Sequence, residues 1–107
     1  AYAALRIVLH SLRDRLPVDE ATDLSSQLPT LIRGIYFEGW NPRAVPDRQH
    51  SLAEFIAPVA ARFSGDPGVD PETTCRSVMK VLARHVSEGE IDDIKACLPK
   101  ELRELWI

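Results

Sequence analysis

The chain has few of the residues that mark a chemical site, and this scarcity removes several function classes. Its 107 residues include two cysteines, three histidines and five glycines. Two cysteines are too few for a disulfide framework, and Cys75 and Cys97 lack the spacing of zinc ligands. There is no Gly-rich phosphate loop and no Gly-x-Ser-x-Gly elbow. Nucleotide-binding, zinc-binding and serine-hydrolase signatures are therefore all missing.

Charge and hydropathy exclude two further classes. The net charge is −3, and the 13 basic and 16 acidic residues are interleaved, whereas a nucleic-acid-binding domain usually carries a basic stripe. No apolar run approaches the roughly 18 residues that span a bilayer, and no signal-peptide pattern is present. We therefore expect a cytoplasmic protein with neither a nucleic-acid nor a membrane partner. The 45% apolar and 27% charged content is that of a globular domain.

The two cysteines have two interpretations. In a reducing compartment, we expect Cys75 and Cys97 to be small apolar core residues. They also lie at similar distances from the break near Ser87, so a hairpin of residues 75–86 and 88–98 would bring them face to face.

The sequence contains an internal repeat with an offset of 70 residues. Residues 5–36 align without a gap with residues 75–106, and eight positions are identical. These are Arg6/Arg76, Val8/Val78, Leu12/Leu82, Glu20/Glu90, Asp23/Asp93, Leu28/Leu98, Pro29/Pro99 and Arg33/Arg103. Apolar residues fall on apolar residues at helical spacing, which indicates a duplicated helical unit.

Each unit is predicted to contain three helices. The first carries an apolar stripe at three-and-four spacing, and Pro17 or Ser87 ends it. The second ends before Pro29 or Pro99, each of which suits the first turn of a short third helix. We expect the following apolar residues to point inward: Val18, Ala21, Leu24, Leu28, Leu31, Ile32 and Ile35 in one unit, and Ile91, Ile94, Leu98, Leu102, Leu105 and Trp106 in the other.

Capping signals mark the other helix starts. Ser87 with Glu90, and Ser51 with Glu54, have the spacing of capping boxes. Asp70 is placed to cap a helix that has Pro71 at its first position. Pro58 lies inside the helix that Ser51 starts, and it kinks or restarts that helix.

These elements predict one all-α domain of residues 1–107, a compact bundle of about six helices built from two pseudo-equivalent repeats. Repeat one covers residues 1–40, the connector 41–50 and repeat two 51–107. The second repeat begins with a helix near 51–64 that has no counterpart in the first. We therefore expect the native protein to carry a further helix upstream of Ala1.

Two long segments resemble a known family. ALRIVLHSLRDRLPVDEATDLSSQLPTLIRGIYFEGW and VLARHVSEGEIDDIKACLPKELRELW are similar to the bacterial family catalogued as domain of unknown function 2267. The LRDRL, QLP and LP-ELR-LW segments carry the resemblance, together with an RGIY-EGW segment in which Phe37 replaces the usual second tyrosine. The resemblance implies a small helical fold and supplies no activity or catalytic residue.

The most unusual segment is the aromatic run that ends the first repeat. The candidate contact residues for a partner or ligand are Arg33, Tyr36, Phe37, Glu38 and Trp40. Tyrosine and tryptophan offer a large contact area with a polar tip, and arginine offers a planar donor fork. Alternatively, Tyr36 and Trp40 seal the seam between the repeats, which the match of Tyr36 with Trp106 favours.

The histidines are not spaced like metal ligands. They are His10, His50 and His85. His10 stands four residues before Asp14, so an acid–base pair is conceivable. The second repeat has Lys80 and Arg84 at these positions, and we therefore expect the histidines to face solvent.

The matched acids Glu20/Glu90 and Asp23/Asp93 raise the question of a carboxylate metal site. Helical-bundle sites of this kind use Glu-x-x-His, and neither repeat contains it. We expect instead that these acids favour helix N-termini and form ion pairs. The matched arginines Arg33/Arg103 are candidates to pair with them.

The sequence thus predicts a non-catalytic protein–protein interaction or assembly module, without a catalytic residue, cofactor or metal ion. Its partner would be another protein or a second copy of the chain, as in a homodimer. The alternative is a small-ligand-binding protein or enzyme with a pocket at the inter-repeat seam, lined by Arg33, Tyr36, Glu38 and Trp40.

Overall fold

The structure is a computed structural model that describes residues 2–47 and 51–106. Within them are seven α-helices and a 3-10 helix, and no strand. The elements are α1 (Tyr2–Asp14), α2 (Val18–Ser25), α3 (Thr30–Phe37), α4 (Leu52–Arg62), α5 (Pro71–His85), α6 (Glu88–Ala96), α7 (Lys100–Arg103) and η1 (Glu104–Trp106). The all-α prediction is confirmed, with one helix more than the expected six.

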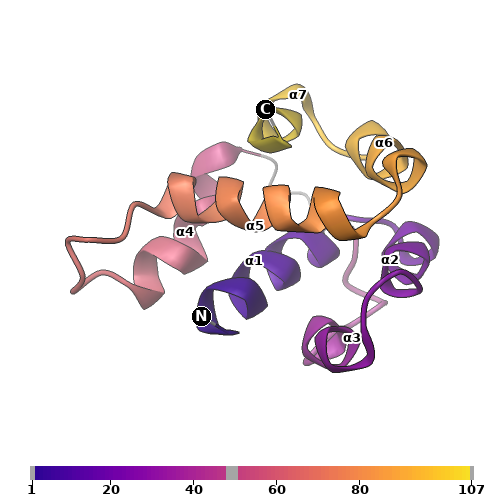
Figure 1. Ribbon diagram of the computed structural model, residues 1–107, viewed down its shortest axis with the longest axis horizontal. Coiled ribbons are helices and arrows are strands. Elements are labelled where there is room, and N and C mark those ends of the chain that lie inside the picture. The colour runs from indigo at the N-terminus through magenta and orange to yellow at the C-terminus, as the bar shows by residue number, and fades with distance from the viewer. Residues whose placement is uncertain (1, 48–50, 107) are drawn as a thin grey trace.

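The two longest helices form the centre of the molecule. Figure 1 shows α5 lying alongside α1, with α2 and α6 side by side at one end and α4 at the other. Helix α3 packs on α1, whereas α7 and η1 lie on the side of α5.

Local sequence explains where the helices begin. Pro17, Pro29 and Pro99 occupy the N-cap positions of α2, α3 and α7, one residue earlier than predicted for the last two. Ser51 and Glu54 form the predicted capping box. Asp70 accepts a hydrogen bond from the Thr73 backbone N–H (3.0 Å). Helix α4 runs through Pro58 without a restart.

The core lies between the helices and consists of nearly all the predicted inward positions. It includes Val8, Leu9, Leu12, Leu16, Ala21, Leu24, Leu28, Tyr36, Phe55, Val59, Cys75, Met79, Leu82, Val86, Ile91, Ile94, Leu98, Leu102 and Leu105. Two inward predictions were wrong: Val18 and Leu31 are exposed, Leu31 to 63%. No helix in the described residues is long and apolar enough to cross a bilayer.

Candidate functional site

An apolar groove opens between α1, α3 and α5, and we call it the seam groove. It has a volume of about 190 Å³. Its lining residues are Leu5, Leu9, Leu28, Pro29, Ile32, Val78, Val81, Leu82 and His85. Val81 is 48% exposed, which is high for a branched apolar side chain on a helix that runs through the core. The groove is thus an apolar surface that the described residues leave open.

Helix α4 covers another surface of the same helix pair. It contacts α1, α5 and α7, and it buries Phe55 and Val59. The Ser11 hydroxyl donates to the Phe55 carbonyl (3.3 Å), and the Arg15 guanidinium stands 5.0 Å from the centre of the Phe55 ring. On α7, Glu101 accepts from the Leu52 backbone N–H (2.7 Å). An amphipathic helix therefore lies across α1 and α5 here, held by apolar anchors and a polar rim.

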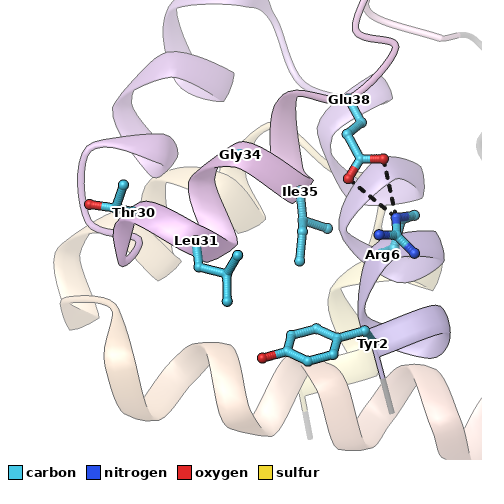
Figure 2. Close-up of a pocket in the computed structure, with 7 residues that line it drawn as sticks. All are labelled: Tyr2, Arg6, Thr30, Leu31, Gly34, Ile35 and Glu38. Atoms are coloured by element: carbon cyan, nitrogen blue, oxygen red, sulfur yellow. Dashed lines mark hydrogen bonds and ion pairs between the residues drawn. The ribbon is translucent and has the colours of Figure 1, made fainter.

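A second hollow lies between α1 and α3, with a volume of about 660 Å³. Its lining residues are Tyr2, Arg6, Thr30, Leu31, Gly34, Ile35 and Glu38. Figure 2 shows the Arg6–Glu38 ion pair at one edge, with the apolar side chains of Leu31 and Ile35 beside it. The pair spans 3.3 Å and both side chains are largely exposed, so it contributes little to stability.

The candidate contact residues do not share one surface. Tyr36 is fully buried, and its hydroxyl donates to the Ala21 carbonyl (2.8 Å). Phe37 and Trp40 are half-buried and packed against the core, with their ring centres 5.2 Å apart. Glu38 alone among the five lines the larger hollow. Tyr36 therefore seals the interior, as the alternative interpretation predicted.

Arg33 does not bond to the carboxylates expected for it. Its guanidinium donates to the Ser25 carbonyl (2.9 Å) and the Leu28 carbonyl (3.1 Å). The Ser25 carbonyl lies at the end of α2 and also accepts from the Leu28 backbone N–H (3.1 Å), and the Leu28 carbonyl lies in the turn after α2. Arg33 thus ties α3 to the end of α2 through backbone carbonyls, and the acidic partners predicted for it were wrong.

Sequence reasoning missed the role of Arg13. This side chain is only 3% exposed, and its guanidinium donates to the Tyr36 carbonyl (2.8 Å) and the Glu38 carbonyl (2.7 Å). Its Nε also contacts the Asp14 carboxylate at 2.8 Å. It therefore satisfies the C-terminal carbonyls of α3 from α1. In the sequence, the only indication of a special role for Arg13 was that it aligns with Ala83 at the offset of 70 residues.

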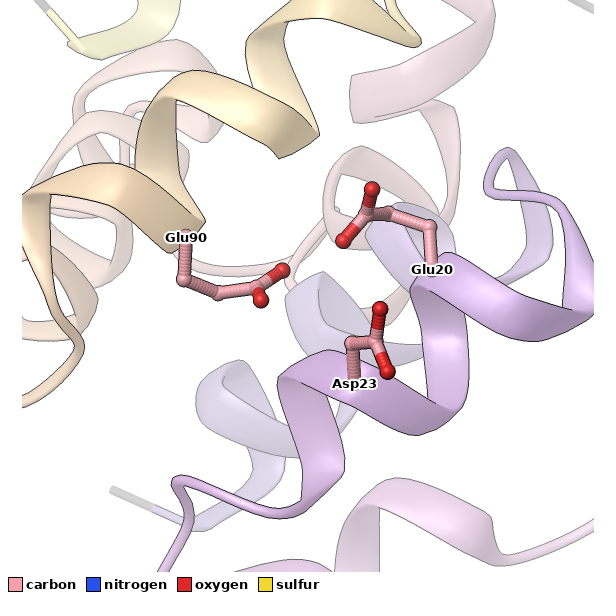
Figure 3. A group of neighbouring side chains, drawn as sticks. All are labelled: Glu20, Asp23 and Glu90. Atoms are coloured by element: carbon pink, nitrogen blue, oxygen red, sulfur yellow. The ribbon is translucent and has the colours of Figure 1, made fainter.

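Three carboxylates meet where α2 packs against α6. One oxygen from each of Glu20, Asp23 and Glu90 lies within 4.8 Å of the other two. Figure 3 shows all three side chains converging on the space between the helices. Glu90 is 8% exposed, and its Oε2 and the Oε2 of Glu20 are buried without a hydrogen-bond partner. The ion pairs predicted for these acids do not form: none of the ion pairs among the described residues includes Glu20, Asp23 or Glu90.

Both glutamates are free to turn inward because neither can complete a capping box. A glutamate at the third helical position normally accepts from the backbone N–H of the N-cap residue. For Glu20 that residue is Pro17, which has no N–H. For Glu90 it is Ser87, whose N–H donates instead to the Gln27 side chain (2.7 Å). The Ser87 hydroxyl still accepts from the Glu90 N–H (3.1 Å), so only half of the predicted capping box forms.

The crowding of carboxylates changes the protonation of Glu90. Burial, then the Glu20 side chain, raises its pKa to about 8. Asp23 and Asp93 act in the same direction. Burial and the surrounding acids also raise the pKa of the half-buried Cys97 thiol. The α2–α6 contact is therefore a concentrated negative region inside the fold.

The remaining candidates take up structural positions. His10 is half-buried, and its Nε2 lies 2.7 Å from the Ile35 carbonyl, so the expected solvent-facing position was wrong for this residue. His85 is exposed as predicted, and His50 lies outside the described residues. Cys75 and Cys97 are free thiols, the first fully buried and the second half-buried.

The fold and its surfaces define a compact all-helical domain with one apolar groove and one acidic seam, and none of the catalytic motifs sought in the sequence. The family model for an uncharacterized conserved protein, DUF2267, matches residues 1–105. The chain therefore belongs to this family, as the resemblance indicated. A comparison with curated proteins finds no match.

Proposed function

We propose that this domain is a non-catalytic assembly module that takes up an amphipathic helix in its seam groove. The observation that carries the proposal is the position of α4. Helix α4 fills one face of the α1–α5 pair, whereas the seam groove leaves comparable apolar residues of the same two helices open.

The proposed duplication supports this correspondence. Helices α2 and α6 begin at Val18 and Glu88, and α3 and α7 begin at Thr30 and Lys100, each pair 70 residues apart. Under the same offset, three residues that hold α4, namely Ser11, Arg15 and Glu101, correspond to Val81, His85 and Leu31. The first two of these counterparts line the seam groove, and Leu31 is exposed and lines the second hollow. A second helix, related to α4 by the pseudo-symmetry, would lie across them.

The chemistry of the groove suits a helix better than a small molecule. At about 190 Å³ it is smaller than the ~300–1,000 Å³ of typical small-molecule sites, and it accommodates apolar anchor side chains. Helices bind to such surfaces through apolar residues at three-and-four spacing. Phe55 and Val59 of α4 have this spacing, so an α4-like helix is the proposed occupant.

The source of that helix is either a second protein, including another copy of this chain, or an upstream segment of the chain itself. The assembly function requires the first source. The predicted upstream helix would occupy the same groove, since it would be the counterpart of α4. The experiment therefore separates these two sources.

A labelled peptide with the sequence of residues 51–64 tests the proposal by fluorescence anisotropy. We expect saturable binding with a Kd on the order of 10⁻⁵ M, since the peptide must fold as it binds. Val81→Arg places a charge in the groove and should weaken binding at least tenfold. Val18→Arg makes the same change at another exposed valine and should leave binding unaltered.

Two results would contradict the assembly function. One is the absence of binding, or equal binding by the two arginine variants. The other is loss of peptide binding in a longer form of the chain that carries residues upstream of Ala1, because the occupant would then be intramolecular.

The alternative, a ligand pocket or active site lined by Arg33, Tyr36, Glu38 and Trp40, has less support. It requires Glu38 to be buried close to Arg33 and Trp40. Glu38 is instead exposed and paired with Arg6, and Arg33 is bonded to backbone carbonyls. The hollow beside Glu38 is lined mainly by apolar atoms of α1 and α3, and no pair of groups suited to acid–base chemistry lines it.

A further inference from the structure

We infer that the acidic seam between α2 and α6 is a binding site for a hard divalent cation of the size of Ca²⁺, with Glu20, Asp23 and Glu90 as ligands. This site is separate from the seam groove and independent of the assembly function. Its ligands come from two helices that are distant in sequence. A bound cation would therefore cross-link the two halves of the fold.

Three converging acids alone do not indicate a metal site. The second observation is Glu90, which is 92% buried, points into the cluster and leaves its Oε2 without a hydrogen-bond partner. Glu20 also has a buried oxygen without a partner. Buried carboxylate oxygens are normally hydrogen-bonded, so two of them without a partner in one cluster point to a ligand outside the protein.

The charges around the cluster all act in the same direction. The three converging side chains, Glu20, Asp23 and Glu90, are all carboxylates. No ion pair among the described residues brings an arginine or lysine to them. A divalent cation would neutralise this repulsion and provide partners for both orphan oxygens.

The chemistry of the ligands indicates the kind of ion. One oxygen from each acid lies within 4.8 Å of the other two, so a single cation between them can reach all three. Oxygen-only ligation is typical of hard cations such as Ca²⁺ and Mg²⁺ rather than of zinc or copper. Ca²⁺ accepts irregular sets of oxygens, whereas Mg²⁺ demands near-ideal octahedral geometry and dehydrates reluctantly. Three acids from two helices therefore favour Ca²⁺.

The test is titration of chelator-treated protein with Ca²⁺, followed by calorimetry and thermal unfolding. We expect one ion per chain with a Kd on the order of 10⁻⁴ M, as in sites with few charged ligands. At about 100 times this Kd, the Tm should rise by roughly 10 °C. Mg²⁺ should bind at least tenfold more weakly.

Matched variants locate the site. Glu90→Gln removes a ligand charge and should abolish the Ca²⁺-dependent rise in Tm, while the ion-free variant remains folded because the change relieves repulsion. Glu88→Gln makes the same substitution two residues away on an exposed side chain of α6 and should bind Ca²⁺ like the wild type. A wild-type Tm unaffected by millimolar Ca²⁺, or equal binding by both variants, would overturn the proposal.

Discussion

The side-chain amide of Gln27 spans the boundary between α2 and α6 to reach Ser87 with both of its polar atoms. Its Oε1 accepts from the Ser87 backbone N–H (2.7 Å), and its Nε2 donates to the Ser87 hydroxyl (3.3 Å). The N-terminus of α6 is therefore capped from a residue 60 positions earlier in the chain. This bridge is also the reason that Glu90 turns toward Glu20.

Gln27→Ala should lower the free energy of unfolding by about 1 kcal/mol, because two hydrogen bonds to a helix N-terminus are lost while water can replace part of them. Urea denaturation measures the change. Ser26→Ala is the control, since the Ser26 hydroxyl bonds only within its own helix, to the Asp23 carbonyl. Equal destabilisation by the two substitutions would refute the bridging role.

Arg13→Lys should cost roughly 2–4 kcal/mol, because lysine cannot reproduce the planar fork that serves two carbonyls and a carboxylate from a buried position. Arg84→Lys on the exposed face of α5 should change the free energy of unfolding by less than about 0.5 kcal/mol. Thermal unfolding of both variants makes the comparison. A tolerant Arg13 site would mean that water satisfies the end of α3.

Tyr36→Phe should destabilise the fold by about 1 kcal/mol, since the buried hydrogen bond from the Tyr36 hydroxyl to the Ala21 carbonyl is lost. The matched control is Tyr2→Phe, because Tyr2 is largely exposed. Chemical denaturation at neutral pH distinguishes them. If the two phenylalanine variants were equally stable, the Tyr36 hydroxyl would contribute nothing.

Stability should fall as pH rises above about 10, and Tyr36 should account for part of this loss. Burial raises its pKa in the folded protein above the ordinary value of about 10. The unfolded chain then releases the proton first, so the stabilisation is complete below pH ~10 and is lost as pH rises. Unfolding curves between pH 9 and 11.5 should be less steeply pH-dependent in Tyr36→Phe. The same slope in both proteins would contradict the assignment.

Cys97 should react with iodoacetamide well before Cys75 at pH 8. Burial raises the pKa of Cys75 to about 11, so its thiolate is scarce as well as inaccessible. Peptide mass spectrometry over a time course measures both rates. In Cys97→Ser, the remaining slow reaction should accelerate only when denaturant is added. Comparable rates for both thiols in native protein would show that Cys75 is accessible.

Much of the fold could be predicted because it depends on local signals. The Ser51–Glu54 capping box, the Asp70–Pro71 start and the proline breaks determine helix boundaries from neighbouring residues alone. The burial of Tyr36 also followed from its alignment with Trp106. These features need only helix periodicity and capping chemistry, which a single sequence contains.

The remaining features depend on which helices meet. The contact of α2 with α6 brings Glu90 next to Glu20 and Gln27 next to Ser87, and no spacing along the chain indicates either pair. His10 was assigned to solvent because its counterpart is Lys80, yet α3 covers it. Leu31 was assigned to the core by its apolar character, although its face of α3 lies outside the packed core. Periodicity identifies an apolar face without telling whether anything covers it.

The exposed side chains of Val81 and Leu31 also bear on how concentrated solutions of the protein behave. Long-range repulsion between molecules depends on their net charge, which vanishes near the isoelectric point of about 5.6. Near that pH, contacts through these apolar side chains meet little electrostatic repulsion from a neighbouring molecule. Light scattering should therefore be most concentration-dependent in mildly acidic buffer. Val81→Arg should both remove one of these apolar contacts and shift the pH of minimum colloidal stability upward.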